Sequence, residues 1–261
     1  MLNLDFTYTK YKDLCEAIDE SKYTPLMFSQ YFSADTLPNK FVILRHDVDR
    51  KPEQALKMAE LENTFGITST YYFRMKNGVF IPEIIRAIEN MGHEIGYHYE
   101  VLDKAKGDFN KAIKIFEGEL NEFRKICNVG TICPHGNPLS NWVNHDLWKK
   151  YDFECFGILG DPYLSIDYSN SFYFTDTGRS WNSKFRVKDV VKESANKTIE
   201  KIKTTDDIII MIKKENSHKI FILTHPNRWN DSFGAWLKEL IWQNVKNIGK
   251  AGILKYKNAF D

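Results

Sequence analysis

The chain has 261 residues, of which 43% are hydrophobic and 27% are charged. These fractions are typical of a folded globular protein and exclude an intrinsically disordered chain. Because 36 basic residues nearly balance 35 acidic ones, with a formal net charge of +1, the composition also argues against a nucleic-acid-binding protein. A chain of this length is normal for one α/β barrel, so we expect residues 1–261 to form a single domain.

The N-terminal segment lacks the features of a secretory signal. It reads M-L-N-L-D-F-T-Y, with an acidic residue where a signal peptide needs a basic and then an apolar run, and no stretch of 18 apolar residues follows. The cysteines Cys15, Cys127, Cys133 and Cys155 form no C-x-x-C pair and occur in or beside apolar runs. Both observations predict a cytoplasmic protein without a membrane span.

Short β-rich runs alternate with longer segments of helical periodicity, a pattern that predicts βαβ units around a parallel sheet. We expect strands at 41–44, 67–73 and 94–98, then one that ends near Cys133, and a last one at 220–223. Helices should begin at Pro52 and near Pro82, and span 108–126, 206–214 and 233–248. The segment 153–186 is rich in glycine and short aromatic runs, and we expect mostly loops there.

Four groups of polar residues fall where a predicted strand ends. They are R-H-D-V-D at 45–49, Y-H-Y-E at 97–100, C-P-H-G-N-P at 133–138 and T-H-P at 224–226. In parallel α/β folds the loops beyond the carboxyl ends of the strands gather on one face, where ligands bind. We therefore expect these groups to meet in one site, although they are far apart in the sequence.

Asp47 and Asp49 are two residues apart on an extended segment and should project to the same side. One carboxylate can bind a metal ion while the other accepts protons, although an isolated D-x-D pair more often caps a helix such as the one at Pro52. The accompanying histidines favour the metal interpretation, because a neutral imidazole beside carboxylates is a natural ligand for Zn²⁺ or a similar ion. His98 is such a candidate, with a satisfied buried histidine as the alternative. His93 would lie on the opposite face of the strand, and we interpret it as structural.

His225 lies between a strand and a proline, where it can act as a general acid or simply bond a carbonyl. His135 lies in a stiff turn that can aim backbone N–H groups at an oxyanion, and it can instead be a ligand or face the solvent. The segment T-D-T-G-R-S-W offers Asp176, Arg179 and Trp181 as a charge partner and an apolar wall, or as plain surface residues.

Taken in order, these segments resemble the motifs of the polysaccharide deacetylases, carbohydrate esterase family four, over roughly residues 41–226. The most specific part is G-H-E-I-G-Y-H at 92–98. The resemblance implies a distorted (β/α) barrel with about seven parallel strands, and a divalent metal, zinc foremost, that activates water to remove an acyl group. It also implies that Asp47 is the catalytic base, Asp49 and His98 are metal ligands, and His225 is the general acid.

One departure from the family pattern concerns the metal ligands. The family's second metal histidine should lie four residues after His98, where this chain has Leu102. Glu100 or His135 can supply the missing ligand. We prefer His135, because it lies in the turn that the family places beside its metal.

A second departure is Ile132, which stands where the family's third motif has an arginine that orients the base, and Arg179 is a candidate for that role. The expected function is removal of an N- or O-acyl group, acetyl or formyl, from an amino sugar or a glycan precursor such as a nucleotide- or lipid-linked sugar. Leu102 leaves open a catalytically inactive sugar-binding protein in surface polysaccharide assembly, and the fold also permits a hydrolase of a non-sugar C–N bond. The residues expected to contact the substrate are Tyr99, Glu100, Arg179 and Trp181.

Overall fold

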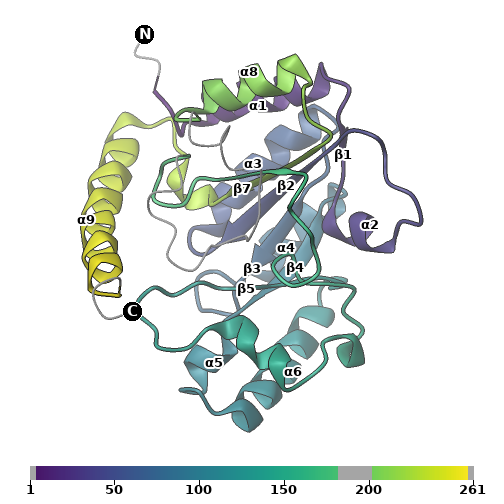
Figure 1. Ribbon diagram of the computed structural model, residues 1–261, viewed down its shortest axis with the longest axis vertical. Coiled ribbons are helices and arrows are strands. Elements are labelled where there is room, and N and C mark those ends of the chain that lie inside the picture. The colour runs from purple at the N-terminus through teal and green to yellow at the C-terminus, as the bar shows by residue number, and fades with distance from the viewer. Residues whose placement is uncertain (1–3, 182–201, 258–261) are drawn as a thin grey trace.

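The computed structural model describes residues 4–181 and 202–257, with side chains up to residue 249. At its centre is a seven-stranded parallel sheet in the order β5-β4-β3-β2-β7-β6, with β1 paired to β2 outside that path. The sheet curls into a half-barrel (Figure 1), which confirms the predicted α/β class and the distorted (β/α) barrel. The strands are β1 Thr24–Pro25, β2 Phe41–Val48, β3 Thr70–Phe73, β4 Glu94–Tyr99, β5 Ile132–Pro134, β6 Phe172–Thr175 and β7 Lys219–Thr224.

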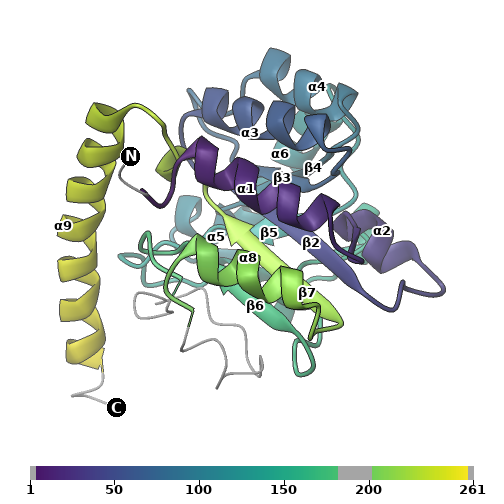
Figure 2. The same ribbon diagram turned by 90° about the horizontal axis from the view of Figure 1, so that it is seen from above.

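Helices surround this sheet, with α1 packed against α8 and α3 against α4. Figure 2 shows α1, α3 and α4 on one side of the strands, while α9 stands at the edge of the molecule. The helices are α1 Tyr8–Asp19, α2 Phe28–Ser33, α3 Pro52–Thr64, α4 Pro82–Asn90, α5 Val101–Lys104, α6 Phe109–Arg124, α8 Thr205–Lys214 and α9 Phe233–Lys257, with the 3₁₀ helices η1 Asn144–Lys149, η2 Glu154–Phe156 and η3 Pro226–Arg228. None of the described helices combines the length and the apolar composition that a bilayer span requires.

The central strand β2 is buried at every position, polar residues included. It runs between β3 and β7, so its own side chains cannot reach water and must find partners inside the protein. His46 lies 2.8 Å from Glu62 Oε1 through Nε2 and 2.7 Å from Thr224 Oγ1 through Nδ1. These partners fix the strand at the point where it enters the site.

His93 belongs to the same buried network, as predicted for a structural histidine. Its Nε2 donates to the carbonyl of Ala59 (3.1 Å), and its Nδ1 accepts from the backbone N–H of Ser69 (3.2 Å). The ring is buried and takes no part in the polar groups at the strand ends.

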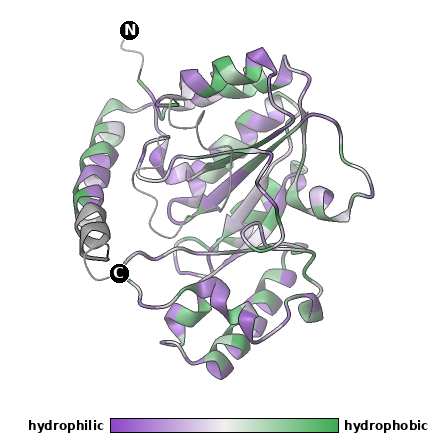
Figure 3. Ribbon diagram, viewed as in Figure 1, coloured by the Kyte–Doolittle hydropathy of each residue, from purple (hydrophilic) through white to green (hydrophobic). Residues whose placement is uncertain are grey.

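Helix α9 turns a polar side to the barrel and an apolar side to solvent. Figure 3 shows hydrophobic and hydrophilic residues alternating along it. The helix is longer than the predicted 233–248. Its buried residues are Glu239, Gln243 and Asn247, and its exposed large apolar residues are Phe233, Leu237, Ile241, Trp242, Val245 and Ile248.

Candidate metal centre

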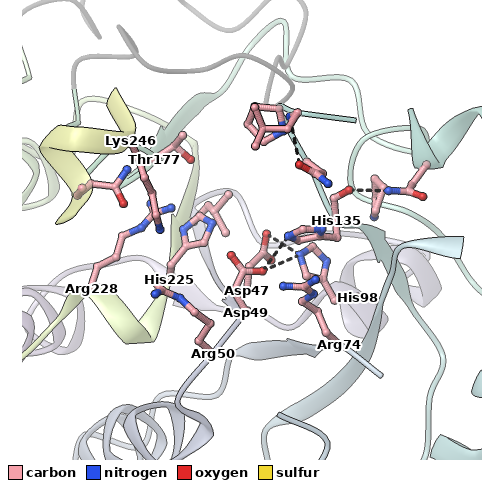
Figure 4. A pocket seen from close by; sticks show the side chains of 18 of the residues that line it. Asp47, Asp49, Arg50, Arg74, His98, His135, Thr177, His225, Arg228 and Lys246 are labelled. Carbon is pink, nitrogen blue, oxygen red and sulfur yellow. Dashed lines mark hydrogen bonds and ion pairs between the residues drawn. The ribbon is translucent and has the colours of Figure 1, made fainter. Parts of the chain in front are cut away.

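Polar side chains from the carboxyl ends of the parallel strands converge on one pocket of about 880 Å³. Asp47 comes from β2, Asp49 from the residue after β2, His98 from β4, His135 from the residue after β5 and His225 from the residue after β7. Figure 4 shows the first four of these residues pointing toward one another, with His225 beside them. The structure therefore brings together the five residues that the sequence placed at separate strand ends.

Asp49 lies at the centre of this group because the chain turns sharply after β2. Its backbone N–H donates to the carbonyl of Asp47 at 3.1 Å. Its Oδ1 lies 3.6 Å from His98 Nε2 and 3.4 Å from His135 Nε2. This oxygen is shielded from solvent and has no hydrogen-bond partner among the described residues. Burial opposes ionisation of Asp49, but the nearby rings of His135, His225 and His98 in their protonated form, together with Arg74, outweigh it and hold the pKa below its usual range.

His98 presents an unprotonated nitrogen to this carboxylate. Its Nδ1–H donates to the carbonyl of Cys133 at 3.0 Å, in the register where β4 pairs with β5. Since a carbonyl can only accept, the hydrogen of the neutral ring is on Nδ1, and Nε2 directs its lone pair at Asp47 and Asp49. Burial lowers the pKa of His98 to about 4, so the ring is neutral at pH 7. A lone pair that faces carboxylates is unfavourable without a cation between them.

The spacing of these atoms fits one divalent ion. Two ligand atoms that each lie about 2.1 Å from a tetrahedral zinc ion are about 3.4 Å apart. Asp49 Oδ1 is separated from the two imidazole nitrogens, of His135 and His98, by 3.4 and 3.6 Å. A carboxylate and two neutral imidazoles also have the donor chemistry that zinc prefers.

Glu100 stands behind His135 and not at the centre of the group. Its Oε2 lies 3.4 Å from His135 Nδ1 and accepts a hydrogen bond from Arg74. The two atoms lie close together without a hydrogen bond, because His135 Nδ1 has no hydrogen-bond partner among the described residues. Glu100 is also not among the described residues that line the pocket, so the geometry gives no contact with a substrate.

A second set of potential ligands shares His98. One ligand atom each of Asp47, His98 and Cys133 lie within 4.8 Å of one another, so a cluster of Asp, His and Cys can hold a metal ion. However, Arg45 donates to both Asp47 oxygens at 2.8 Å and to Cys133 Sγ at 2.6 Å. The charge of the guanidinium disfavours a metal ion at Asp47 and Cys133.

Arg45 therefore holds Asp47, the expected base, and the prediction that Arg179 does so is wrong. Arg179 donates to the carbonyl of Trp236 at 2.8 Å, and its guanidinium lies 4.5 Å from the centre of that indole ring. Arg45 was not predicted, although the sequence contains the necessary signal. It precedes Asp47 by two residues on a strand, so both side chains lie on the same face.

Two further residues expected to contact the substrate are core residues. Trp181 is fully buried, and its Nε1–H donates to Thr205 Oγ1 at 3.1 Å. Tyr99 is fully buried, and its hydroxyl donates to Asp161 at 2.9 Å. Like Arg179, neither residue is among the described residues that line the pocket. The predictions of substrate contact are wrong for all three.

The backbone N–H of His135 is not available to an oxyanion, although the sequence suggested that N–H groups of this turn could face one. Its N–H donates to the carbonyl of Tyr99 at 2.8 Å, which continues the pairing of β4 with β5 by one residue. The carbonyl of His135 accepts from Asn144 Nδ2 at 2.9 Å. The peptide is thus fixed on both sides, and only the ring of His135 reaches the site.

His225 forms a buried dyad with Asp176. Its Nδ1–H donates to Asp176 Oδ1 (2.7 Å) and its backbone N–H to Oδ2 (2.9 Å). Asp176 also accepts from Arg228 Nη1 (2.7 Å) and Trp229 Nε1 (2.9 Å). Burial opposes ionisation of Asp176, but Arg228 and His225 hold its pKa below the usual value. Asp176 is thus the charge partner that the sequence suggested, and it fixes the ring of His225 at the wall of the pocket.

Leu102, which stands where the sequence resemblance implies a second metal histidine, belongs to the core. It is 1% exposed, and its backbone N–H donates to Asn144 Oδ1 at 3.0 Å. The potential ligand atom that Leu102 cannot supply is replaced by His135 Nε2, which lies 3.4 Å from Asp49 Oδ1.

Comparisons of the chain with protein-family models, curated proteins and solved structures find no match. The chemistry of the residues that line the pocket is therefore the main support for a function.

Proposed function

We propose that the protein is a metal-dependent hydrolase that removes an acetyl or formyl group from an amino sugar or a glycan precursor, as in the polysaccharide deacetylases that its motifs resemble. The observation that carries the proposal is Asp49 Oδ1, which is shielded from solvent, lacks a hydrogen bond to described residues and lies 3.4 to 3.6 Å from two imidazole nitrogens. Asp49, His98 and His135 would hold the ion, which we take to be zinc. When bound, such an ion lowers the pKa of a coordinated water and polarises the acyl carbonyl.

The residues around this centre can carry the proton transfers of acyl hydrolysis. Asp47, held by Arg45, accepts a proton from water as the oxygen adds to the acyl carbon. His225 then gives a proton to the leaving nitrogen or oxygen as its bond to that carbon breaks. Acetic or formic acid and the free amine or hydroxyl are the products. Asp176 keeps the ring of His225 in place by its bond to Nδ1.

The metal site is tested by measuring bound zinc and acyl release together. We expect the wild-type protein to bind about one equivalent of zinc by elemental analysis after dialysis. His135→Gln and Asp49→Asn should weaken zinc binding by about 10-fold or more, because each removes one of three ligands. His145→Gln is the matched control, since His145 lines the same pocket and lies 3.6 Å from Asp146 instead of Asp49.

Acyl release is measured with N-acetyl and N-formyl amino sugars and their phosphorylated derivatives. Release that depends on zinc and is lost in Asp47→Asn and His225→Gln supports the hydrolase. Zinc binding without release from any of these compounds would favour the sugar-binding alternative. A wild-type protein that takes up no divalent metal contradicts the proposal.

A further inference from the structure

The charged residues that line the pocket are distributed unevenly. The described lining includes the carboxylates of Asp47 and Asp49 and four basic side chains, which are Arg50, Arg74, Arg228 and Lys246. Arg74 is paired with Glu100 on the metal side of the pocket. Figure 4 shows Lys246 and Arg228 on the side of His225 that faces away from His98 and His135, with Arg50 nearby. We call Arg50, Arg228 and Lys246 the cationic wall.

The members of the cationic wall differ in how their charges are compensated. Arg228 is paired with Asp176 through Nη1 at 2.7 Å, and Arg50 with Glu239 through Nη2 at 3.1 Å. Lys246 lies over the ring of Trp242, 5.1 Å from its centre, and forms no ion pair with any residue that the structure describes. Burial lowers the pKa of Lys246 and the charge of Arg50 lowers it further, while Glu239 opposes both effects. The lysine thus lies where a cation is unfavourable unless an anion joins it.

The contacts of α9 hold Lys246 toward the pocket. Asn247 donates through Nδ2 to the carbonyl of Gly178 at 2.8 Å and accepts from Gln243 Nε2 at 3.1 Å. Both residues are buried on the polar side of the helix. Gln243 and Lys246 line the pocket, and so does the half-exposed ring of Trp242, so α9 forms one of the pocket's walls.

We propose that the cationic wall binds a phosphate or diphosphate group of the substrate, which makes the substrate a phosphorylated acyl sugar. This inference rests on the proposed function and names the substrate class of the same site. Ammonium and guanidinium groups are the side chains that bind phosphate oxygens, and three of them here face one space. The half-exposed indole of Trp242 offers an apolar surface beside them for a sugar or a base. A pocket of about 880 Å³ has room for both parts of such a molecule.

Direct binding of inorganic pyrophosphate to the metal-free protein tests the inference, with calorimetry as the measurement. Lys246→Gln removes one charge without breaking an ion pair and should weaken binding by about 10- to 100-fold. Lys238→Gln is the matched control, because Lys238 is an exposed lysine of the same helix that does not line this pocket among the described residues. It should bind pyrophosphate as the wild type does. Pyrophosphate binding that is absent in the wild type, or equal in Lys246→Gln, would overturn the inference.

The source of the phosphate is resolved by competition. A nucleoside diphosphate and a prenyl diphosphate in detergent micelles are each added to the pyrophosphate complex. Displacement by the first at lower concentration supports a nucleotide-linked sugar, and displacement by the second supports a lipid-linked one. Displacement by neither contradicts a phosphorylated sugar substrate.

The inference and the proposed function can fail separately. Asp49→Asn should lose zinc but still bind pyrophosphate, since Asp49 is a carboxylate outside the cationic wall. A protein that binds pyrophosphate through Lys246 but releases no acyl group contradicts the hydrolase and leaves the anion site in place. A protein that releases acetate equally fast from N-acetylglucosamine and from its 1-phosphate supports the hydrolase and overturns the anion site.

Discussion

At the scale of single residues, three buried aspartates in the described part of the chain differ in how their charge is compensated. Asp47 and Asp176 each lie against a guanidinium, which compensates their charge. Asp161 is fully buried without such a partner in contact, and it accepts hydrogen bonds from the hydroxyl of Tyr99 (2.9 Å) and the backbone N–H of Tyr163 (2.8 Å). Burial raises the pKa of Asp161 to about 7, so this group holds its proton far above the usual range for an aspartate.

The free energy of unfolding should therefore fall as the pH rises through the range that Asp161 controls. The folded state binds the proton up to about pH 7 and the unfolded state only up to about pH 3.8, so the contribution is fully present below 3.8 and is lost as the pH rises through 7. Asp161→Asn cannot ionise and should remove this part of the pH dependence. Urea unfolding of both proteins between pH 4 and 8 measures it. The same decline in wild type and variant would contradict the assignment.

The sequence predicted which site residues lie close together, because each of them lies at or after the carboxyl end of a predicted strand. Asp49, His98 and His135 were expected on one face of the sheet because parallel strands share a direction, and the structure brings them together. The side chains of Arg179 and Trp181 were placed wrongly, because a turn-rich sequence does not reveal which side of a loop faces the core. Arg179 has a φ of +58°, in the left-handed region, and this conformation could not be predicted from the residues around it.

At the scale of elements, Gly96 in β4 leaves room for the ring of Tyr72 on β3, which lies next to an arginine of the site. A Cβ at this position would lie 2.3 Å from ring atoms of Tyr72 on β3, so the ring occupies the space that a side chain would need. The guanidinium of Arg45 lies 5.5 Å from the centre of the same ring and donates to Asp47. The glycine thus allows Tyr72 to support the arginine that fixes the expected base.

Gly96→Ala should lower the free energy of unfolding by about 1–3 kcal/mol, because the new methyl group overlaps the Tyr72 ring. It should also reduce acyl release through displacement of Arg45. Gly118→Ala in the exposed part of α6 is the control, since no described atom lies within 4 Å of the added Cβ, and alanine should stabilise that helix by about 0.5–1 kcal/mol. Urea unfolding tests both changes. Equal stability of the two variants would show that β3 and β4 can move apart at no cost.

Helices with proline starts and long apolar periodicity were predicted well, and strands embedded in loops were not. The helix predicted at Pro52 and the helix predicted over 108–126 form as α3 and α6. The strand expected at 41–44 continues to Val48, because the polar residues that follow find buried partners and need not leave the sheet. Strand β6 lies in the segment 153–186, which was expected to be mostly loop. The strand was missed because four residues are too few to show a periodic pattern. Residues 182–186 of this segment lie outside the described part of the chain.

At the scale of the whole molecule, α9 is attached to the barrel mainly by polar contacts. Trp236 Nε1–H donates to the carbonyl of Asp5 (2.7 Å), Asn247 to that of Gly178 (2.8 Å), and Glu239 pairs with Arg50 (3.1 Å). Single contacts of this kind contribute about 0.5–1.5 kcal/mol each. The strands of the sheet, by contrast, are held by clusters of fully buried apolar side chains.

A helix held by a few polar contacts detaches at lower free energy than the core unfolds, so backbone amides of α9 should exchange with deuterium faster than those of β2. Because Lys246 belongs to α9, pyrophosphate should slow exchange there by about 10-fold or more and leave β2 unchanged. Hydrogen exchange with mass spectrometry measures α9 and β2 in one experiment. Equal protection of both elements by pyrophosphate would contradict the prediction. On this prediction, ligand binding would tighten α9 against a sheet whose own stability does not change.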